Sequence, residues 1–164
     1  MKTYTERHIR RSELFQIILL QHLYTRPESS RLVFQGGTAL RWCHNGGRFS
    51  EDLDFVTHLE RTALERLMKA IEAQVARESI AHFGPGRLTV TPRGQRDEGV
   101  VWRVAFEPQN SRDRIMVKVE CEQLREGVAL ATEPRVLGMQ NAVSYLIASG
   151  ELRIPRPNSV LVVE

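Results

Sequence analysis

Two aspartates separated by one residue are the first feature of this sequence that could do chemistry. Asp52 and Asp54 lie on either side of Leu53, so an extended strand would place both carboxylates on one face and Leu53 and Phe55 on the other. Neighbouring carboxylates repel each other unless a proton or a cation lies between them. Oxygen ligands of this kind suit Mg²⁺, which usually binds together with substrate phosphates. An Asp-x-Asp alone is more often a solvated strand end than a metal site.

A glycine pair precedes the two aspartates. The apolar run 32–34 ends at Gly36 and Gly37, and residues 38–43 have the pattern of a short helix. Adjacent glycines at a strand-to-helix turn leave backbone N–H groups accessible near a helix N-terminus, where the helix dipole favours an anion. Either motif alone is commonly incidental. The order strand, glycine turn, helix and Asp-x-Asp strand is much more specific, and it predicts a phosphate site beside the carboxylates.

Two longer segments have helical periodicity and would pack beneath these motifs. Apolar residues recur at helical spacing in residues 10–25, for which Ser12 is the expected N-cap, and in residues 58–80. Residues 27–31 are expected to form a loop between the first helix and the first strand. Both apolar stripes are interpreted as core-packing faces.

Three further strands are predicted, and the last one carries charged residues. The segments 87–92, 100–107 and 114–121 are separated by polar turns, which favour antiparallel pairing. Alternation along the last strand places Lys118 and Glu120 opposite its apolar face. Glu120 can therefore supply a third carboxylate, although a solvated sheet face explains the same pattern equally well.

Composition and length indicate one soluble globular domain. The chain has 164 residues, 41% of them hydrophobic and 26% charged, with a net charge of +3. A mild positive charge is compatible with nucleotide or RNA partners, and solubility explains it as well. Cys43 and Cys121 have no spacing suited to zinc, so a reduced pair is expected. No segment approaches the roughly 20 apolar residues needed to span a bilayer.

The motif region resembles the AbiEii/AbiGii toxin family, a branch of the DNA polymerase β-like nucleotidyltransferases. The family signature is a Gly-Gly-Thr-Ala-Leu segment followed by Arg-Phe-Ser-Glu-Asp-Leu-Asp-Phe. This sequence carries these two segments at residues 36–40 and 48–55. The resemblance covers residues 12 to 122.

The resemblance implies an α/β (α+β) nucleotidyltransferase fold, with a mixed, mainly antiparallel sheet and helices packed on one face. It implies metal-dependent transfer of a nucleoside monophosphate from an NTP to an acceptor hydroxyl. Asp52, Asp54 and Glu120 would be the catalytic residues and would hold Mg²⁺ or Mn²⁺. The nucleotide-binding groups expected on this basis are Gly36, Gly37, Thr38, Arg48, Ser50 and Lys118.

The resemblance also sets expectations for domains and partners. Residues 1–125 would form the nucleotidyltransferase core, and residues 126–164 a short C-terminal extension that is truncated or divergent relative to the helical half of the family. A short helix is expected at 141–149 and a β-like run at 160–163. The expected substrate is an NTP, and the expected acceptor is a tRNA, another RNA or a protein. A cognate antitoxin and a second copy of the chain are the expected protein partners. The expected location is the bacterial cytoplasm, with no membrane association.

Two other functions remain open from the sequence. The chain could be a catalytically impaired remnant that acts as a nucleotide-, RNA- or partner-binding module, because the helical motifs of the family are not found after residue 123. Alternatively, the acceptor could be a small molecule, as in antibiotic nucleotidyltransferases.

Overall fold

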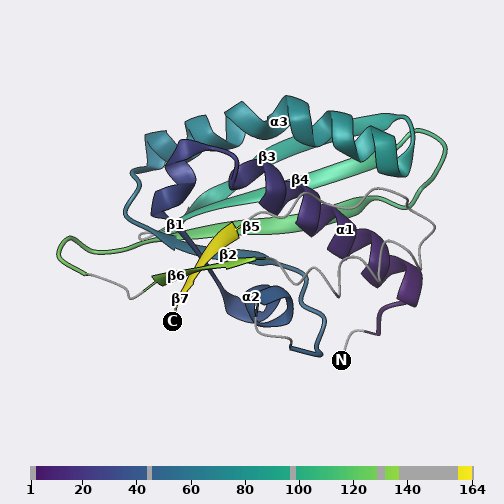
Figure 1. Cartoon of the computed structure of the whole chain (residues 1–164). Helices are drawn as coiled ribbons and strands as arrows, with labels where there is room; N and C mark the ends of the chain where they lie inside the picture. Colours follow the sequence, from purple (N-terminus) through teal and green to yellow (C-terminus); the bar gives the residue numbers. More distant parts are fainter. Residues whose placement is uncertain (1–2, 44–45, 97–98, 129–131, 137–158, 164) are drawn as a thin grey trace.

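The computed structural model describes residues 3–43, 46–96, 99–128, 132–136 and 159–163. Within these residues, seven strands form one sheet in the order β3-β4-β5-β2-β1-β7-β6 (Figure 1). The strands are β1 (Leu32–Gln35), β2 (Leu53–Thr57), β3 (Gly86–Arg96), β4 (Gly99–Pro108), β5 (Ile115–Gln123), β6 (Thr132–Val136) and β7 (Ser159–Val163).

The sheet is mixed and mainly antiparallel, as expected. The pairs β1–β2, β3–β4, β4–β5 and β6–β7 are antiparallel, whereas β2–β5 and β1–β7 are parallel. The predicted antiparallel meander of the three later strands is therefore confirmed. The parallel pairing of β2 with β5 places the beginnings of these two strands at the same end of the sheet.

Two long helices cover one face of the sheet. Helix α1 (Glu6–Leu23) packs against α3 (Arg61–Phe83) and β5, and α3 also packs on β3 and β4 (Figure 1). The shorter α2 (Gly36–Cys43) packs on β1 and β2. The loop expected at 27–31 is a 3₁₀ turn, η1 (Pro27–Arg31).

The first helix begins earlier than the sequence predicts. Thr5, not Ser12, is its N-cap, because the Thr5 side chain accepts a hydrogen bond from the His8 N–H at 3.1 Å. Ser12 lies within the helix and is buried. The expected boundary was wrong for two reasons. Ser12 packs inside the helix and does not cap it, and the capping hydrogen bond is made by Thr5, which precedes the apolar stripe.

Alternation along the strands gives the sheet one apolar face against the helices and an opposite face that is mixed, where Lys118 and Glu120 lie on the same side as buried Val33, Val56 and Val101. The inward-facing residues join α1, α2 and α3 in a single core. Those from the strands are Leu32, Phe34, Leu53, Phe55, Val100, Trp102, Val104, Phe106, Ile115, Val117, Val119 and Cys121. The predicted alternation of β5 is confirmed, with Lys118 and Glu120 half-buried on the opposite face. In the described part of the chain, no helix combines the length and apolarity required for crossing a membrane.

The described segments after residue 125 extend the same sheet. The β-like run expected at 160–163 is confirmed as strand β7, which pairs in parallel with β1, and β6 forms the adjoining edge. The helix expected at 141–149 lies outside the described residues.

Candidate active site

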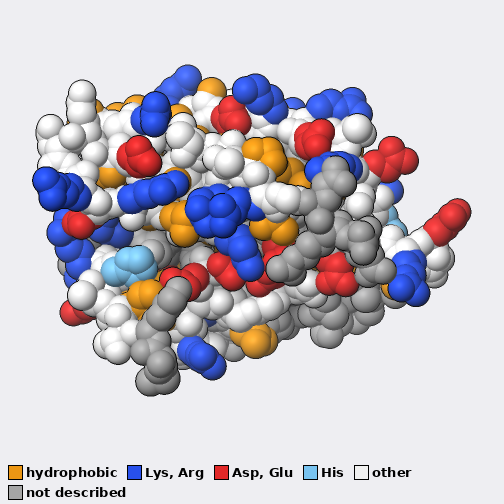
Figure 2. All heavy atoms as spheres, turned by 180° about the vertical axis from the view of Figure 1, so that it is seen from behind, with side chains coloured by type: hydrophobic (Ala, Val, Ile, Leu, Met, Phe, Trp, Pro, Cys, Tyr) orange, Lys and Arg blue, Asp and Glu red, His pale blue; other side chains and the backbone are white. Residues whose placement is uncertain are grey.

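The acidic residues meet where β2 lies beside β5. Asp54 and Glu120 are register partners in the parallel pair, and Asp52 immediately precedes β2. Leu53 and Phe55 are buried on the core side, so the carboxylates project from the opposite face as the two-residue spacing predicts. Acidic and basic side chains adjoin one another on the face turned away from α1 and α3 (Figure 2). The sheet thus brings together three carboxylates that are distant in the sequence.

Lys118 lies between two of these carboxylates. Its Nζ is 3.3 Å from Asp52 Oδ2 and 3.3 Å from Glu120 Oε2. The three side chains are between 24% and 40% exposed, so solvent reaches this cluster. The Lys118 ammonium therefore occupies the position between Asp52 and Glu120 where a cation reduces the repulsion between their carboxylates.

The environment shifts two pKa values in the cluster. Burial raises the pKa of Asp54 above its ordinary value, and the charges of Asp52 and Glu120 raise it further, against the opposing effect of Lys118. Burial works to lower the pKa of Lys118, but the carboxylates of Asp52 and Glu120 outweigh burial and raise it. Lys118 is therefore protonated at neutral pH, and Asp54 has a raised affinity for a proton.

The glycine turn lies directly beside Asp54. Gly36 has a φ of +81°, and a Cβ on this residue would lie 2.7 Å from Asp54 Oδ2. A Cβ on Gly37 would lie 2.9 Å from Ser50 Oγ. Both contacts are closer than real Cβ atoms allow, so the turn and the carboxylate can be neighbours only because residues 36 and 37 lack side chains. The predicted proximity of Gly36–Gly37 to the acidic pair is confirmed.

The structure gives Thr38 a different contact from the one expected. Its side chain is fully buried, and its hydroxyl donates a hydrogen bond to the Asp52 carbonyl and lies 3.5 Å from the Ser50 carbonyl. A hydroxyl engaged in this way holds the start of α2 to the loop before β2. This geometry argues against the expected phosphate contact and makes Thr38 a positioning residue.

A second positioning contact comes from α1. Gln16 is fully buried, and its amide nitrogen donates to the Ser50 carbonyl at 2.7 Å and to the Glu51 carbonyl at 3.2 Å. In the sequence, Gln16 stands out only as a polar interruption of an apolar helix. A buried amide needs hydrogen-bond partners, and this requirement is the signal that could have identified it.

A buried ion pair joins α1 to α2. Glu13 is fully buried and pairs with Arg41, whose guanidinium also donates to the Gly47 carbonyl at 3.1 Å and lies 5.8 Å from the Trp42 ring centroid. Burial raises the pKa of Glu13, and Arg41 acts in the opposite direction. This pair fixes α2 and the loop that leads to Ser50.

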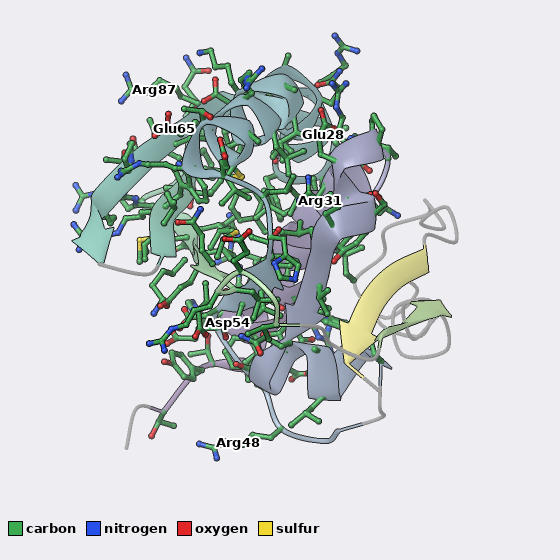
Figure 3. The ribbon with its side chains drawn as sticks, turned by 90° about the vertical axis from the view of Figure 1, so that its left-hand side faces the viewer. Glu28, Arg31, Arg48, Asp54, Glu65 and Arg87 are labelled. Atoms are coloured by element: carbon green, nitrogen blue, oxygen red, sulfur yellow. The ribbon has the colours of Figure 1, made fainter. Side chains whose placement is uncertain are left out.

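Two other expected nucleotide-binding residues lie in that loop. Ser50 is half-buried beside Gly37. Arg48 is exposed and points into solvent, away from Asp54 (Figure 3). The structure therefore places Ser50 at the glycine turn but does not bring Arg48 to the carboxylates.

An aromatic cluster that sequence patterns did not predict adjoins the acidic loop. Tyr4 stacks on His8 with ring centroids 5.0 Å apart and contacts Phe49 edge-on at 5.4 Å. A hydrogen bond to the Glu51 carboxylate raises the pKa of Tyr4 to about 12. The start of α1 is thereby tied to the loop that carries Glu51 and Asp52.

The carboxylates of Asp52, Asp54 and Glu120 are chemically suited to a hard divalent cation, because carboxylate oxygens are the ligands that Mg²⁺ and Mn²⁺ prefer. As arranged in the described residues, no group of three or more His, Cys, Asp or Glu side chains is gathered closely enough to hold a metal ion. Lys118 explains this spacing, since its ammonium lies between Asp52 and Glu120. Metal binding here would require the Lys118 side chain to move aside.

Comparison with protein families gives one match. The family profile described as "Nucleotidyl transferase AbiEii toxin, Type IV TA system" matches residues 18–138, which include both glycine and acidic motifs. No curated protein sequence matches the chain significantly.

Solved structures give similar folds at low sequence identity. MenT4, a nucleotidyltransferase toxin from Mycobacterium tuberculosis, is 22% identical with a TM-score of 0.51, covering 94% of this chain and 49% of that one. JHP933 from Helicobacter pylori is 22% identical with a TM-score of 0.49, covering 82% and 51%. The chain spans about half the length of these proteins.

Proposed function

The chain belongs to the AbiEii nucleotidyl transferase toxin family, and we propose that it transfers a nucleoside monophosphate from an NTP to a hydroxyl on an RNA or protein acceptor. The observation that carries this proposal is the convergence of Asp52, Asp54 and Glu120 beside the Gly36 turn. Phosphoryl-type transfer depends chiefly on positioning and charge stabilisation, and this site supplies groups for both.

The triphosphate would bind between the glycine turn and Lys118. Backbone N–H groups at Gly36 and Gly37 are approachable because no side chain covers them, and the Ser50 hydroxyl adjoins them. Lys118 would release its carboxylates and neutralise phosphate charge. The Arg48 contact stays a prediction, and it requires the loop to turn this side chain inward.

Asp52, Asp54 and Glu120 would hold Mg²⁺ or Mn²⁺. Their carboxylate oxygens and the phosphate oxygens of the substrate would together provide the ligands. When bound, such ions stabilise charge on the phosphates and lower the pKa of an attacking hydroxyl. The residues themselves have separate tasks. Asp52 and Asp54 would hold the ion against which the α-phosphate is oriented, and Glu120 would either hold a second ion or accept the proton of the acceptor hydroxyl on a carboxylate oxygen.

The proposed reaction forms one bond and breaks one. The acceptor oxygen attacks the α-phosphorus of the NTP, and the bond between that phosphorus and the bridging oxygen of pyrophosphate breaks. With Glu120 as the base, the hydroxyl proton passes to its carboxylate, and pyrophosphate leaves with the negative charge. Lys118 and the turn at Gly36 and Gly37 would stabilise that charge.

The family description also supports a biological context. We propose that the chain acts as the toxin of a bacterial toxin–antitoxin pair in the cytoplasm, that a cognate antitoxin controls it, and that a second copy can associate with it.

A transfer assay tests the activity. The purified chain is incubated with each α-³²P-labelled NTP, Mg²⁺ or Mn²⁺, and bacterial RNA, protein or small-molecule acceptors. We expect a labelled RNA or protein with the wild type, no labelling with Asp52→Asn/Asp54→Asn, and full labelling with Glu65→Gln/Glu72→Gln, which removes two carboxylates on the surface of α3. Labelling by the aspartate variant would refute this site assignment.

The placement of Lys118 favours a second candidate, a nucleotide- or RNA-binding module without transfer activity. The Lys118 ammonium offsets part of the negative charge of the acidic cluster, which reduces the need for a metal ion at the site. NTP-dependent stabilisation of the fold that does not depend on Mg²⁺ or Mn²⁺, with no labelled product, would support this alternative.

A further inference from the structure

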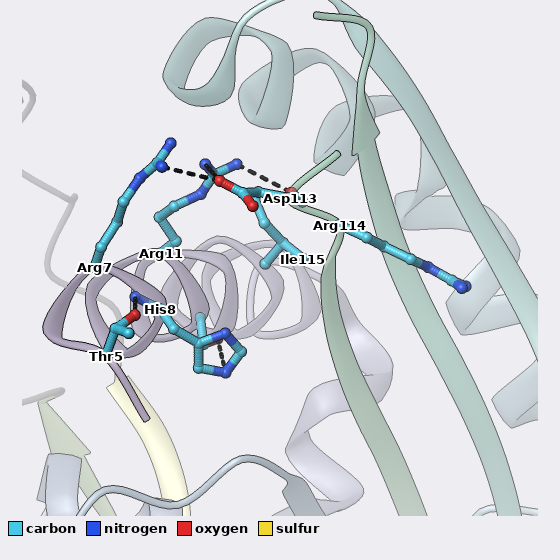
Figure 4. Close-up of a pocket in the computed structure, with 8 residues that line it drawn as sticks. Thr5, Arg7, His8, Arg11, Asp113, Arg114 and Ile115 are labelled. Carbon is cyan, nitrogen blue, oxygen red and sulfur yellow. Dashed lines mark hydrogen bonds and ion pairs between the residues drawn. The ribbon is translucent and has the colours of Figure 1, made fainter. Parts of the chain in front are cut away.

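A cavity of about 440 Å³ lies at the N-terminal end of α1, between that helix and the residues that precede β5. It is lined by the charged residues Arg7, Arg11, Asp113 and Arg114, and by Thr5, His8, Ser12 and Ile115 (Figure 4). This volume is in the usual range for small-ligand pockets. Nothing in the proposed transfer reaction uses these residues.

The cavity has more positive charge than its carboxylate neutralises. Arg7 and Arg11 both direct Nη1 to the same oxygen of Asp113, at 2.9 Å and 3.7 Å. Arg11 is largely buried, and within the described residues its Nε has no hydrogen-bond partner. Burial and the charge of Arg7 lower the pKa of Arg11, whereas Asp113 raises it. Arg11 also donates from Nη2 to the Asp113 carbonyl at 3.3 Å and lies 5.5 Å from the Phe83 ring centroid, so Arg7, whose side chain is 69% exposed, is the guanidinium most accessible to a second anion. Two guanidinium charges against one carboxylate leave a net positive charge that favours such an anion.

The helix terminus is not itself the binding feature. The Thr5 hydroxyl already accepts the His8 backbone N–H. Arg114 lies at the cavity wall but points away from Asp113 and pairs with Glu107 at 3.6 Å (Figure 4). The anion-binding groups are therefore the guanidiniums of Arg7 and Arg11. Guanidinium groups bind phosphate oxygens in bidentate geometry, which makes phosphate a better match than a spherical anion.

The cavity and the acidic cluster lie at the same end of the sheet. Asp113 shortly precedes β5 and Asp52 immediately precedes β2, and these strands are parallel neighbours. The first turn of α1 bridges the two loops: Arg7 contacts Asp113, and Tyr4 lies beside Glu51. A ligand bound in the cavity on the α1 side could therefore reach Asp52 by passing round this end of the sheet beside Tyr4.

Aromatic rings occupy the space between the two sites. His8 lines the cavity and stacks on Tyr4, and Tyr4 contacts Phe49 next to the acidic loop. Stacked rings beside cationic groups are the combination with which proteins bind single-stranded nucleic acid, since bases stack on rings while phosphates meet arginines.

We propose that the cavity formed by Arg7, Arg11 and Asp113, here called the α1 phosphate pocket, binds a backbone phosphate of a single-stranded polynucleotide whose bases stack on Tyr4, His8 and Phe49. The strand runs from this pocket toward the acidic cluster, which makes it the acceptor of the transfer reaction. This inference rests on the proposed function for the role of the strand, but binding itself does not require catalysis.

Fluorescence anisotropy with a labelled oligouridylate, in EDTA and without NTP, tests the pocket. Arg7→Gln/Arg11→Gln should raise Kd about tenfold and reduce the slope of log K against log salt by about 0.7 for each phosphate that the protein no longer neutralises. Asp113→Asn should lower Kd several-fold, because the competing carboxylate is removed. A variant that merely misfolds cannot bind more tightly, so this second variant keeps the test decisive.

Matched controls separate the pocket from general charge. Arg66→Gln/Arg77→Gln removes the same charge from the exposed side of α3 and should leave Kd within about twofold, since these residues do not line the cavity. Phe49→Ala should weaken the binding of oligouridylate, because a stacking ring is lost. Inorganic phosphate should still displace the oligonucleotide from this variant, because the arginines of the pocket are intact. The inference would be overturned if both arginine double variants lost affinity equally, or if Arg7→Gln/Arg11→Gln left Kd unchanged. Weaker binding by Asp113→Asn would also overturn it. Displacement of the oligonucleotide by polyglutamate as readily as by unlabelled oligouridylate would overturn the polynucleotide assignment.

Failure of this inference and failure of the proposed function give different results. Asp52→Asn/Asp54→Asn should bind the oligonucleotide at least as tightly as the wild type even though it transfers nothing. An active wild type whose oligonucleotide affinity does not depend on Arg7 and Arg11 would refute only the pocket. Tight, pocket-dependent binding without any labelled product would refute only the transfer reaction.

Discussion

A methyl group on Gly36 would lie 2.7 Å from Oδ2 of Asp54. Gly36 also has a φ of +81°, which disfavours any side chain at this residue. The glycine of the proposed phosphate-binding turn and the carboxylate of the acidic strand are thus immediate neighbours because the glycine has no Cβ. A side chain at residue 36 would therefore displace Asp54.

Gly36→Ala should therefore destabilise the fold by about 2 kcal/mol or more, combining left-handed backbone strain with the contact to Asp54. Chemical denaturation measures the effect. Gly47→Ala is the matched control, because a Cβ there meets nothing within 4 Å, and it should be nearly neutral. An equal loss in both variants would show that neither the backbone conformation of Gly36 nor its contact with Asp54 explains the result.

Lys118→Met should make the acidic cluster depend on a metal ion. Loss of the ammonium removes the effect that lowers the pKa of Asp54, so this pKa rises further. A carboxyl group with a raised folded-state pKa costs stability as pH rises from the ordinary aspartate range through the raised value. The variant should lose about 1 kcal/mol at neutral pH.

Thermal unfolding across pH, with and without Mn²⁺, measures the Lys118 effect. The metal should restore the lost stability in Lys118→Met and should stabilise it more than the wild type. Lys69→Met, which removes an exposed lysine paired with Glu72, serves as control. Loss of stability that is independent of both pH and Mn²⁺ would contradict a neutralising role for Lys118.

Thr38→Val should weaken the loop before β2. The substitution keeps the shape of the buried side chain but removes the donor to the part-buried Asp52 carbonyl, which costs about 1–3 kcal/mol. Denaturation gives the stability, and hydrogen exchange at residues 50–54 gives the local effect. Thr62→Val on the exposed surface of α3 should change neither. Normal protection of the loop in Thr38→Val would argue that Gln16 holds it alone.

The Tyr4 hydroxyl should titrate unusually late. Its pKa is raised to about 12 because the neutral hydroxyl hydrogen-bonds to Glu51, and deprotonation would place two negative charges together. Glu51→Gln should return this pKa toward about 10. NMR titration of ¹³C-labelled tyrosine, assigned with Tyr4→Phe, makes the measurement. An identical Tyr4 titration in both proteins would mean that the contact with Glu51 does not form in solution.

The sequence by itself determined the order of elements and the chemistry of the central motif. Alternation in β2 and β5 identified which side chains face the core, because burial of apolar residues fixes the register of a two-residue repeat. The same alternation placed Lys118 and Glu120 on the acidic face, and the Gly36–Gly37 turn was recognised from residue types that permit close approach.

Tertiary structure decided which distant residues touch. The parallel pairing of β2 with β5 made Asp54 and Glu120 partners, and no local pattern specifies such a contact. Thr38 carries a hydroxyl suited to phosphate, yet its burial against the Asp52 carbonyl gives it a positioning role. The α1 phosphate pocket depends on Arg7 meeting Asp113, more than one hundred residues away. Local sequence encodes conformational preference and burial, whereas ion pairs and hydrogen bonds between distant segments exist only after the sheet has brought those segments together.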